Sequence, residues 1–353
     1  MDFLFDIPIV GLFFQLLAYL ITVLPGLAPN TLALATPIAL GAMCGVMCER
    51  SGVVNIGIEG TMLIGAFVGF VAGVVAVSLV PSEPTAVFGL TLPLFIAVGA
   101  AMLAGMLISV LHAWLTISVR ADQIVAGVII NIAAVGVTGY FNHFMEAGTR
   151  GAGIFRTFAP PAFLVDLPFV GWLFAMFLRQ GPIAMSVILI VITLQVLLFR
   201  SRWGLRTRAV GEHPKAADTV GINVIAQRYK NVIIGGAFAG LAGGYLTLEL
   251  TSSFQDGMTT GRGFIALAAV IFGRWTPVGA LLGALLFAGS EALGIAISIR
   301  PPPGGLGELL VGVPNNVYRA LPYVLTIVIL AGVVGRSIPP AAVGRPYEKE
   351  STA

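Results

Sequence analysis

The chain has 353 residues, of which 58% are hydrophobic and only 10% are charged, and its formal net charge is +3. A soluble globular protein carries about 25% charged residues, so this composition excludes a water-soluble fold. The net charge is that of loops facing a cytoplasm and does not indicate a nucleic-acid-binding surface. Uncharged runs such as 96–119 exceed the roughly 18 residues that indicate a transmembrane helix.

Such runs recur over the whole chain and predict an all-α, polytopic transmembrane helical bundle with about eight to ten spans. The apolar/polar alternation that a β-barrel needs is absent, and the first 30 residues do not have the features of a removable signal peptide. The candidate spans are residues 7–24, 32–48, 53–80, 92–118, 123–145, 181–199, 231–250, 264–273, 277–299 and 320–335.

Two runs have lengths that do not suit one straight crossing. Run 264–273 is too short and is expected to be half of a broken helix, whereas run 53–80 is too long and is expected to be broken or tilted. The motif FGRWTPVG interrupts the second half, because Pro277 cannot continue a helix. One break in each half resembles the paired discontinuities of inverted-repeat transporters.

Basic residues gather between 200 and 230, which places this loop in the cytoplasm. Counting spans from it puts both termini inside and makes 146–180 the main external loop, with a short surface helix. We therefore expect one transmembrane domain over residues 1–335 and a short cytoplasmic tail over 336–353.

Several small residues within the apolar runs have packing roles. Cys44 and Cys48 are expected to be small buried residues, and His112 a hydrogen-bonded residue between helices. Glycines at every fourth position let helix backbones approach closely in lipid. They are Gly65, Gly69 and Gly73, and Gly236, Gly240 and Gly244.

The polar stretch GEHPKAADTVGIN lies between two apolar runs. Pro214 suits the first turn of a helix, where its missing N–H is no loss, and Gly221 suits its end. About two turns lie between them, with Ala216, Ala217 and Val220 on one small apolar face. Without Trp, Phe or Leu this helix is a poor lipid anchor. It suits a groove in a soluble partner, and the alternative is a solvated loop.

This stretch resembles the coupling helix of permease subunits of ATP-binding-cassette (ABC) importers, in the branched-chain amino acid, ribose and nucleoside permease family. His213 stands where the family often has Asn. The resemblance implies that the helix inserts into a cleft on the ATPase subunit and passes its motion to the membrane helices. The positions that carry the pattern are Gly211, Glu212, Pro214, Ala216, Ala217, Gly221 and Ile222.

Four more stretches are similar to the shorter permease of nucleoside-type importers that depend on a basic membrane lipoprotein. They are ERSGVVNIGIEGTMLIGAF, RADQIVAGVIINIAAVG, RGFIALAAVIFGRWTPVGALLGALLF and GRSIPPAAVGRPYEK. The resemblance implies a multi-pass subunit of a bacterial-type inner membrane that carries nucleosides. It also implies a second, different permease, ATPase subunits and an extracytoplasmic substrate-binding lipoprotein as partners.

The sequence has no P-loop motif and no pattern of metal ligands, catalytic triad or paired carboxylates. We therefore expect no enzyme activity, catalytic residue, metal or cofactor in this chain, and ATP and Mg would belong to the partner ATPase.

Glu59 is a charged residue just inside a long apolar run. A charge at the bilayer centre costs about 2.5–3.5 kcal/mol, so it persists only beside a cavity, a partner or a freed backbone N–H group. One hypothesis makes residues 53–60 a broken segment near the translocation path, with Asn55 and Glu59 facing that path. The alternative is that Glu59 holds a neighbouring helix through Arg50 or a backbone end near the cytoplasmic interface.

Four further side chains are candidates for the path: Gln123, Asn131, Arg274 and Trp275. Gln123 and Asn131 lie roughly on one helix face, and neutral amides suit the hydroxyls and base edges of a nucleoside. Hydrogen bonds between helices are an equally good role for both. Arg274 would bridge helix ends or face the path, and Trp275 suits an interface.

Three alternatives stay open. The cargo would be a branched-chain amino acid or a sugar in the same family, or the chain would be an ion-driven secondary transporter with Glu59 as its ion site. The third is a structural membrane subunit without transport.

Overall fold

The computed structural model describes residues 8–80, 88–145, 152–167, 170–302 and 337–348, and the single positions 313, 317, 320 and 324. No β-strand occurs within these residues, and the all-α prediction is confirmed. The helices are α1 (Pro8–Arg50), α2 (Ile58–Leu79), α3 (Leu92–Ala113), α4 (Gln123–His143), α5 (Ala162–Val165), α6 (Gly171–Leu178), α7 (Pro182–Arg200), α8 (Arg202–Glu212), α9 (Pro214–Thr219), α10 (Val224–Tyr245), α11 (Arg262–Phe272) and α12 (Pro277–Ile299). Two π-helical turns, Trp114–Ser118 and Leu246–Leu250, extend α3 and α10.

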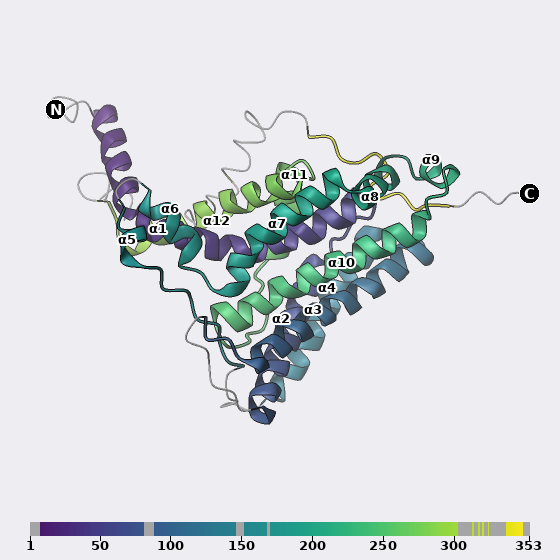
Figure 1. Ribbon diagram of the computed structural model, residues 1–353, viewed down its shortest axis with the longest axis horizontal. Helices are drawn as coiled ribbons and strands as arrows, with labels where there is room; N and C mark the ends of the chain where they lie inside the picture. Colours follow the sequence, from purple (N-terminus) through teal and green to yellow (C-terminus); the bar gives the residue numbers. More distant parts are fainter. Residues whose placement is uncertain are drawn as a thin grey trace, which may run out of the picture. The chain divides into compact units, whose positions relative to one another are not determined.

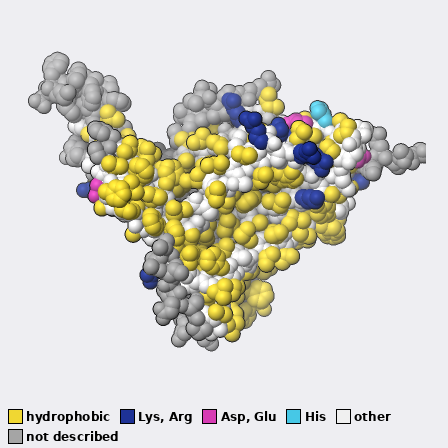
Figure 2. All heavy atoms as spheres, in the orientation of Figure 1, with side chains coloured by type: hydrophobic (Ala, Val, Ile, Leu, Met, Phe, Trp, Pro, Cys, Tyr) yellow, Lys and Arg dark blue, Asp and Glu magenta, His cyan; other side chains and the backbone are white. Residues whose placement is uncertain are grey.

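Seven helices in the described part of the chain are long and apolar enough to cross a membrane, which confirms the polytopic bundle. They are α1, α2, α3, α4, α7, α10 and α12, where α3 and α10 include their π-helical turns. Figure 2 shows hydrophobic side chains over much of the visible face around α7 and α10, and basic side chains around α8. Helix α11 has only 11 residues, so the prediction of a half-length helix there is also confirmed.

Two expected spans are wrong as separate helices, because 7–24 and 32–48 form the single helix α1. Helix α1 continues through Pro25 and Pro29, since membrane helices tolerate proline where neighbouring groups satisfy the freed carbonyls. The break in run 53–80 is confirmed: residues 51–57 are not helical, and Glu59 already lies in the first turn of α2. Apart from positions 320 and 324, the expected span 320–335 lies outside the described residues.

The chain forms two compact units. Unit 1 comprises residues 1–35, 158–180 and 285–336, and unit 2 comprises residues 36–157, 181–284 and 337–353. In unit 1, the Tyr19 hydroxyl donates to the Arg300 carbonyl oxygen at 2.8 Å, and Tyr19 packs with Ile297. The short helices α5 and α6 lie in the predicted external loop. The division into residues 1–335 and 336–353 stays a prediction.

The core of unit 2 is formed by α2, α3 and α10, which pack against one another (Figure 1). Glycines set their spacing: a Cβ on Gly65 would lie 2.7 Å from the Gly240 Cα, and one on Gly105 would lie 2.2 Å from the Gly236 carbonyl oxygen. Any larger residue would force these backbones apart. The predicted packing role of the glycine repeats is therefore confirmed for this core.

Candidate functional site

The coupling segment, residues 201–222, has the local structure that its sequence predicts. Pro214 occupies the first turn of α9, and Gly221 follows its end with a φ of +82°. The Gly221 N–H donates to the Asp218 carbonyl oxygen at 2.9 Å, and the Ile222 N–H to that of Ala217 at 3.1 Å. This pair of bonds is a Schellman motif, so the predicted helix bounds are confirmed.

The two faces of α9 differ from the expectation. Ala216 and Val220 are exposed, Val220 to 74%, but Ala217 is buried. Ala217 lies in a cluster with Val210, Val224 and Tyr347. The prediction that Ala216, Ala217 and Val220 share one apolar face for a partner is therefore wrong for Ala217. Tyr347 comes from the distant C-terminal tail, which helical periodicity cannot reveal.

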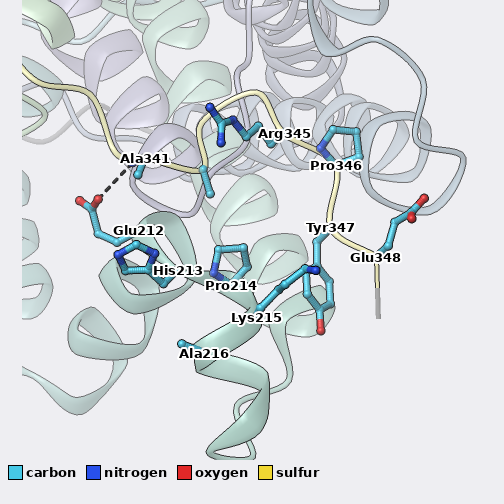
Figure 3. Close-up of a pocket in the computed structure, with 11 residues that line it drawn as sticks. Glu212, His213, Pro214, Lys215, Ala216, Ala341, Arg345, Pro346, Tyr347 and Glu348 are labelled. Carbon is cyan, nitrogen blue, oxygen red and sulfur yellow. Dashed lines mark hydrogen bonds between the residues drawn. The ribbon is translucent and has the colours of Figure 1, made fainter. Parts of the chain in front are cut away.

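Gly211 and Glu212 attach the coupling segment to the rest of unit 2. A Cβ on Gly211 would lie 2.2 Å from the Arg50 carbonyl oxygen, so only glycine fits against the end of α1. The Gly211 carbonyl oxygen accepts from the Ala342 N–H at 2.9 Å, and the Glu212 carboxylate from the Ala341 N–H at 3.1 Å (Figure 3). The segment thus contacts both α1 and the tail.

Glu59 caps the short helix α11. Its two carboxylate oxygens accept from the Gly261 N–H at 2.7 Å and the Gly263 N–H at 2.6 Å. These are unpaired N–H groups at a helix N-terminus, where a negative charge is stabilising. Of the two alternatives for a holding role, the backbone end is the one observed. The Arg50 Nε donates instead to the Trp275 carbonyl oxygen at 2.7 Å.

Gln123 and Asn131 hold the non-helical link before α2 from one face of α4, as their spacing predicts. The Asn131 side chain accepts from the Gly60 N–H at 2.7 Å and donates to the Ile56 carbonyl oxygen at 3.0 Å. The Gln123 side chain accepts from the Val54 N–H at 2.7 Å. In this structure both amides therefore connect segments of the protein.

Asn55 extends the same polar cluster. Its amide nitrogen donates weakly to the sulfur atoms of Cys44 and Cys48, at 3.8 and 3.9 Å, and both cysteines are buried as predicted. The His112 Nε2 lies 3.0 Å from the Val54 carbonyl oxygen, so His112 is hydrogen-bonded as predicted, to the link before α2 and not to another helix. Within the described ranges, no three His, Cys, Asp or Glu side chains gather closely enough to hold a metal ion.

Arg274 and Trp275 form the turn between α11 and α12, with φ values of 51° and 53°. The Trp275 indole N–H donates to the Glu49 carboxylate, and its side chain is buried. Placing Trp275 at an interface is wrong for this structure, because the indole finds a carboxylate inside the protein. The Arg274 side chain is exposed, while its carbonyl oxygen accepts from Arg50 at 3.1 Å.

Besides Glu49, two buried charged residues have partners that the sequence does not mark. Arg228 is one of the basic residues between 200 and 230, yet it is 1% exposed and donates to the carbonyl oxygens of Ser51 at 3.1 Å and Arg345 at 3.0 Å. Glu249 caps α7, accepting from the Ile183 and Ala184 N–H groups at 2.7 and 3.1 Å. The available signal was a charge inside or beside an apolar run, but the partners are backbone atoms that no sequence motif marks.

Comparison with known proteins matches residues 27–330 to the family described as the permease component of the branched-chain amino acid transport system. The chain belongs to this permease family. It is a multi-pass membrane transport subunit and not an enzyme, and membership implies that separate ATPase and other ABC subunits complete the transporter. No solved structure matches the chain.

Individual permeases match over almost their whole length. The guanosine ABC transporter permease protein NupQ of Bacillus subtilis (strain 168) is 40% identical over 94% of this chain and 98% of its own. The nucleoside ABC transporter permease protein NupC of Lactococcus lactis subsp. cremoris is 36% identical, over 91% and 96%. The putative glucose ABC transporter permease protein TsgC13 of Haloferax volcanii is 34% identical, over 92% and 98%.

Proposed function

We propose that this permease carries nucleosides in an ATP-driven ABC importer. The observation that carries the proposal is the 40% and 36% identity to permeases named for guanosine and for nucleosides, each over more than nine-tenths of both chains. The motifs NIGIEG and FGRWTP, which resemble the nucleoside branch, also lie at the two breaks that hydrogen bonds of Asn131 and Trp275 hold.

The proposed assembly contains a second, different permease, ATPase subunits and an extracytoplasmic substrate-binding lipoprotein. Residues 1–335 act as one membrane domain, and the coupling segment docks onto an ATPase subunit. ATP-driven closure of the ATPases moves α9. Gly211, whose Cα has no room for a side chain beside the Arg50 carbonyl oxygen, then passes that motion to the end of α1.

The six candidate path residues have positioning roles in this proposal. Gln123, Asn131 and Asn55 hold the link before α2, and Glu59 holds the start of α11. Arg274 and Trp275 hold the turn before α12. The six residues therefore hold the two breaks beside the translocation path. The helix ends that the cargo passes are then fixed in position.

Transport into proteoliposomes tests the proposal. The permease pair and ATPase subunits are reconstituted with the binding lipoprotein and radiolabelled guanosine. We expect uptake that requires ATP, is competed by other nucleosides, and ignores excess leucine or glucose. Uptake that persists without ATP and collapses with an ionophore would instead assign an ion-driven transporter, and unchanged uptake without this chain would assign a structural subunit.

A sugar is the second candidate cargo, supported by the 34% identity to a putative glucose permease over 92% of this chain. A branched-chain amino acid is supported by the family description alone. The same assay separates them, because labelled glucose or leucine would then accumulate with ATP while labelled guanosine would not.

A further inference from the structure

The C-terminal segment 337–348, here called the strap, lies along the coupling segment. Its backbone donates twice, from Ala342 to the Gly211 carbonyl oxygen at 2.9 Å and from Ala341 to the Glu212 carboxylate at 3.1 Å. The Tyr347 ring, 8% exposed, covers the inner face of α9 within the Ala217 cluster. The strap therefore fixes one face of the helix that is proposed to engage the ATPase.

The strap is also bound to the ends of two membrane helices. The buried Arg228 of α10 donates to the Arg345 carbonyl oxygen at 3.0 Å, and the Gly344 N–H donates to the Gly52 carbonyl oxygen, just after α1, at 3.3 Å. A guanidinium removed from water keeps its geometry only while its acceptors stay in place. A load on the strap thus acts on α1 and α10 together.

A groove of about 1160 Å³ separates the strap from the start of α9 (Figure 3). Both acidic side chains of the groove are engaged within the chain, since Glu212 accepts from Ala341 and Glu348 pairs with Arg120 at 2.8 Å. Arg345 is exposed, and no ion pair of its side chain is found among the described residues. The groove therefore favours an acidic occupant.

We propose that the strap and the coupling segment form one composite docking surface, and that its groove receives an acidic segment of the ATPase subunit. The proposal rests on the proposed function, in which α9 engages that subunit. The occupant follows from continuity, because Arg345 of the strap and the start of α9 line the same groove, beside the helix that is proposed to engage that subunit. Opposite charges at such a rim set orientation and the rate of association.

The test measures binding of the purified ATPase subunit to the full-length permease complex in detergent over a range of salt concentrations. Arg345→Glu is expected to weaken binding by about tenfold at low salt and less at high salt, because a rim charge acts through screened attraction. The matched control is Lys230→Glu, the same reversal at an exposed cation outside the groove, with unchanged binding. Equal binding by Arg345→Glu and the original chain would overturn the proposal.

Tyr347 supplies a second, independent arm. Tyr347→Ala removes the ring that covers α9 and is expected to lower ATPase binding, whereas Tyr347→Phe keeps the ring and restores it. All variants are compared as monodisperse complexes of equal yield. If Arg345→Glu lost affinity for anionic lipid nanodiscs while ATPase binding stayed unchanged, the groove would belong to the membrane surface and the proposal would fail.

Failure of the strap and failure of the coupling role give different results. Val220→Arg places a charge on the exposed end of α9, at a residue that does not line the groove. If Val220→Arg blocks ATPase binding and the strap variants do not, only the composite surface is wrong. If Val220→Arg has no effect either, the coupling role itself is wrong. Cargo identity does not enter this binding assay.

Discussion

The coupling segment and the starts of the apolar helices α7 and α11 both need partners for free backbone N–H groups, but they are held in different ways. Ser201 caps helix α8 by accepting from the Gly204 N–H, three residues along the chain. Asn223 caps α10 in the same way, from the Ala226 N–H. Helix α11 is capped by Glu59 from 202 residues away, and α7 by Glu249 from 66 residues away. Local caps thus serve the coupling segment, and distant carboxylates serve the N-termini of α7 and α11.

The difference follows from the surroundings. Where a segment is exposed, water satisfies whatever a short polar side chain does not, so one local hydroxyl or amide is enough. Among apolar helices no water replaces a missing partner, and each unsatisfied N–H group is costly. A carboxylate can accept two such groups at once and adds a favourable charge at the helix N-terminus. The buried acids of this permease are therefore structural connectors.

The largest expected effect breaks the distant caps. Glu249→Ala is expected to lower the free energy of unfolding by about 3 kcal/mol, because two charge-assisted hydrogen bonds are lost and two N–H groups stay buried. Glu59→Ala should cost somewhat less, about 2 kcal/mol, because Glu59 is only half-buried and water reaches it more easily. Thermal unfolding of the purified protein in detergent measures both.

The isosteric variants sharpen this result. Glu249→Gln and Glu59→Gln keep one amide oxygen as acceptor and lose the charge, so each should recover about half of the stability that alanine removes. If the alanine variants unfolded at the same temperature as the original chain, the capping role would be wrong. Loss of guanosine uptake at unchanged stability would move Glu59 from a positioning role to the path itself.

A smaller effect is expected at the link before α2. Asn131→Ala leaves the Gly60 N–H and the Ile56 carbonyl oxygen without their partner and should cost about 1.5 kcal/mol. Asn142→Ala is the matched control, because Asn142 lies on the same helix but its bond to Asp256 is exposed. Its cost should stay below about 0.5 kcal/mol. Equal losses in the two variants would mean that the link does not depend on Asn131.

The same division explains what the sequence could predict. Pro214 and Gly221 mark α9 because helix capping depends on residues a few positions apart, and the structure has these bounds. Glu59 and Asn131 stood out as polar residues in apolar runs, but their partners are backbone groups of distant segments. Hydropathy marks a residue as unusual and does not name its partner.

Two failures have the same origin. The sequence places Ala217 on an apolar face for a partner because the tail that covers it is far away in sequence. Nothing in the local sequence separates Arg228 from the other basic residues of 200–230, although distant carbonyl groups bury it. The seven residues of the coupling pattern are recognisable from the sequence alone, whereas no motif in the strap indicates that it packs against α9. Tertiary partners decide burial, and a local pattern cannot supply them.

The smallest expected effect tests the local caps. Gly221 has a φ of +82°, and a Cβ there would meet no atom within 4 Å, so Gly221→Ala costs only backbone strain. That strain is about 1 kcal/mol. It should fray the end of α9 and weaken ATPase binding several-fold while the unfolding temperature of the membrane helices stays the same. Gly221→Asn is the control, because Asn tolerates this conformation and should bind more tightly than Ala. A fall in global stability would show instead that the coupling segment is held as the starts of α7 and α11 are, by the rest of the fold.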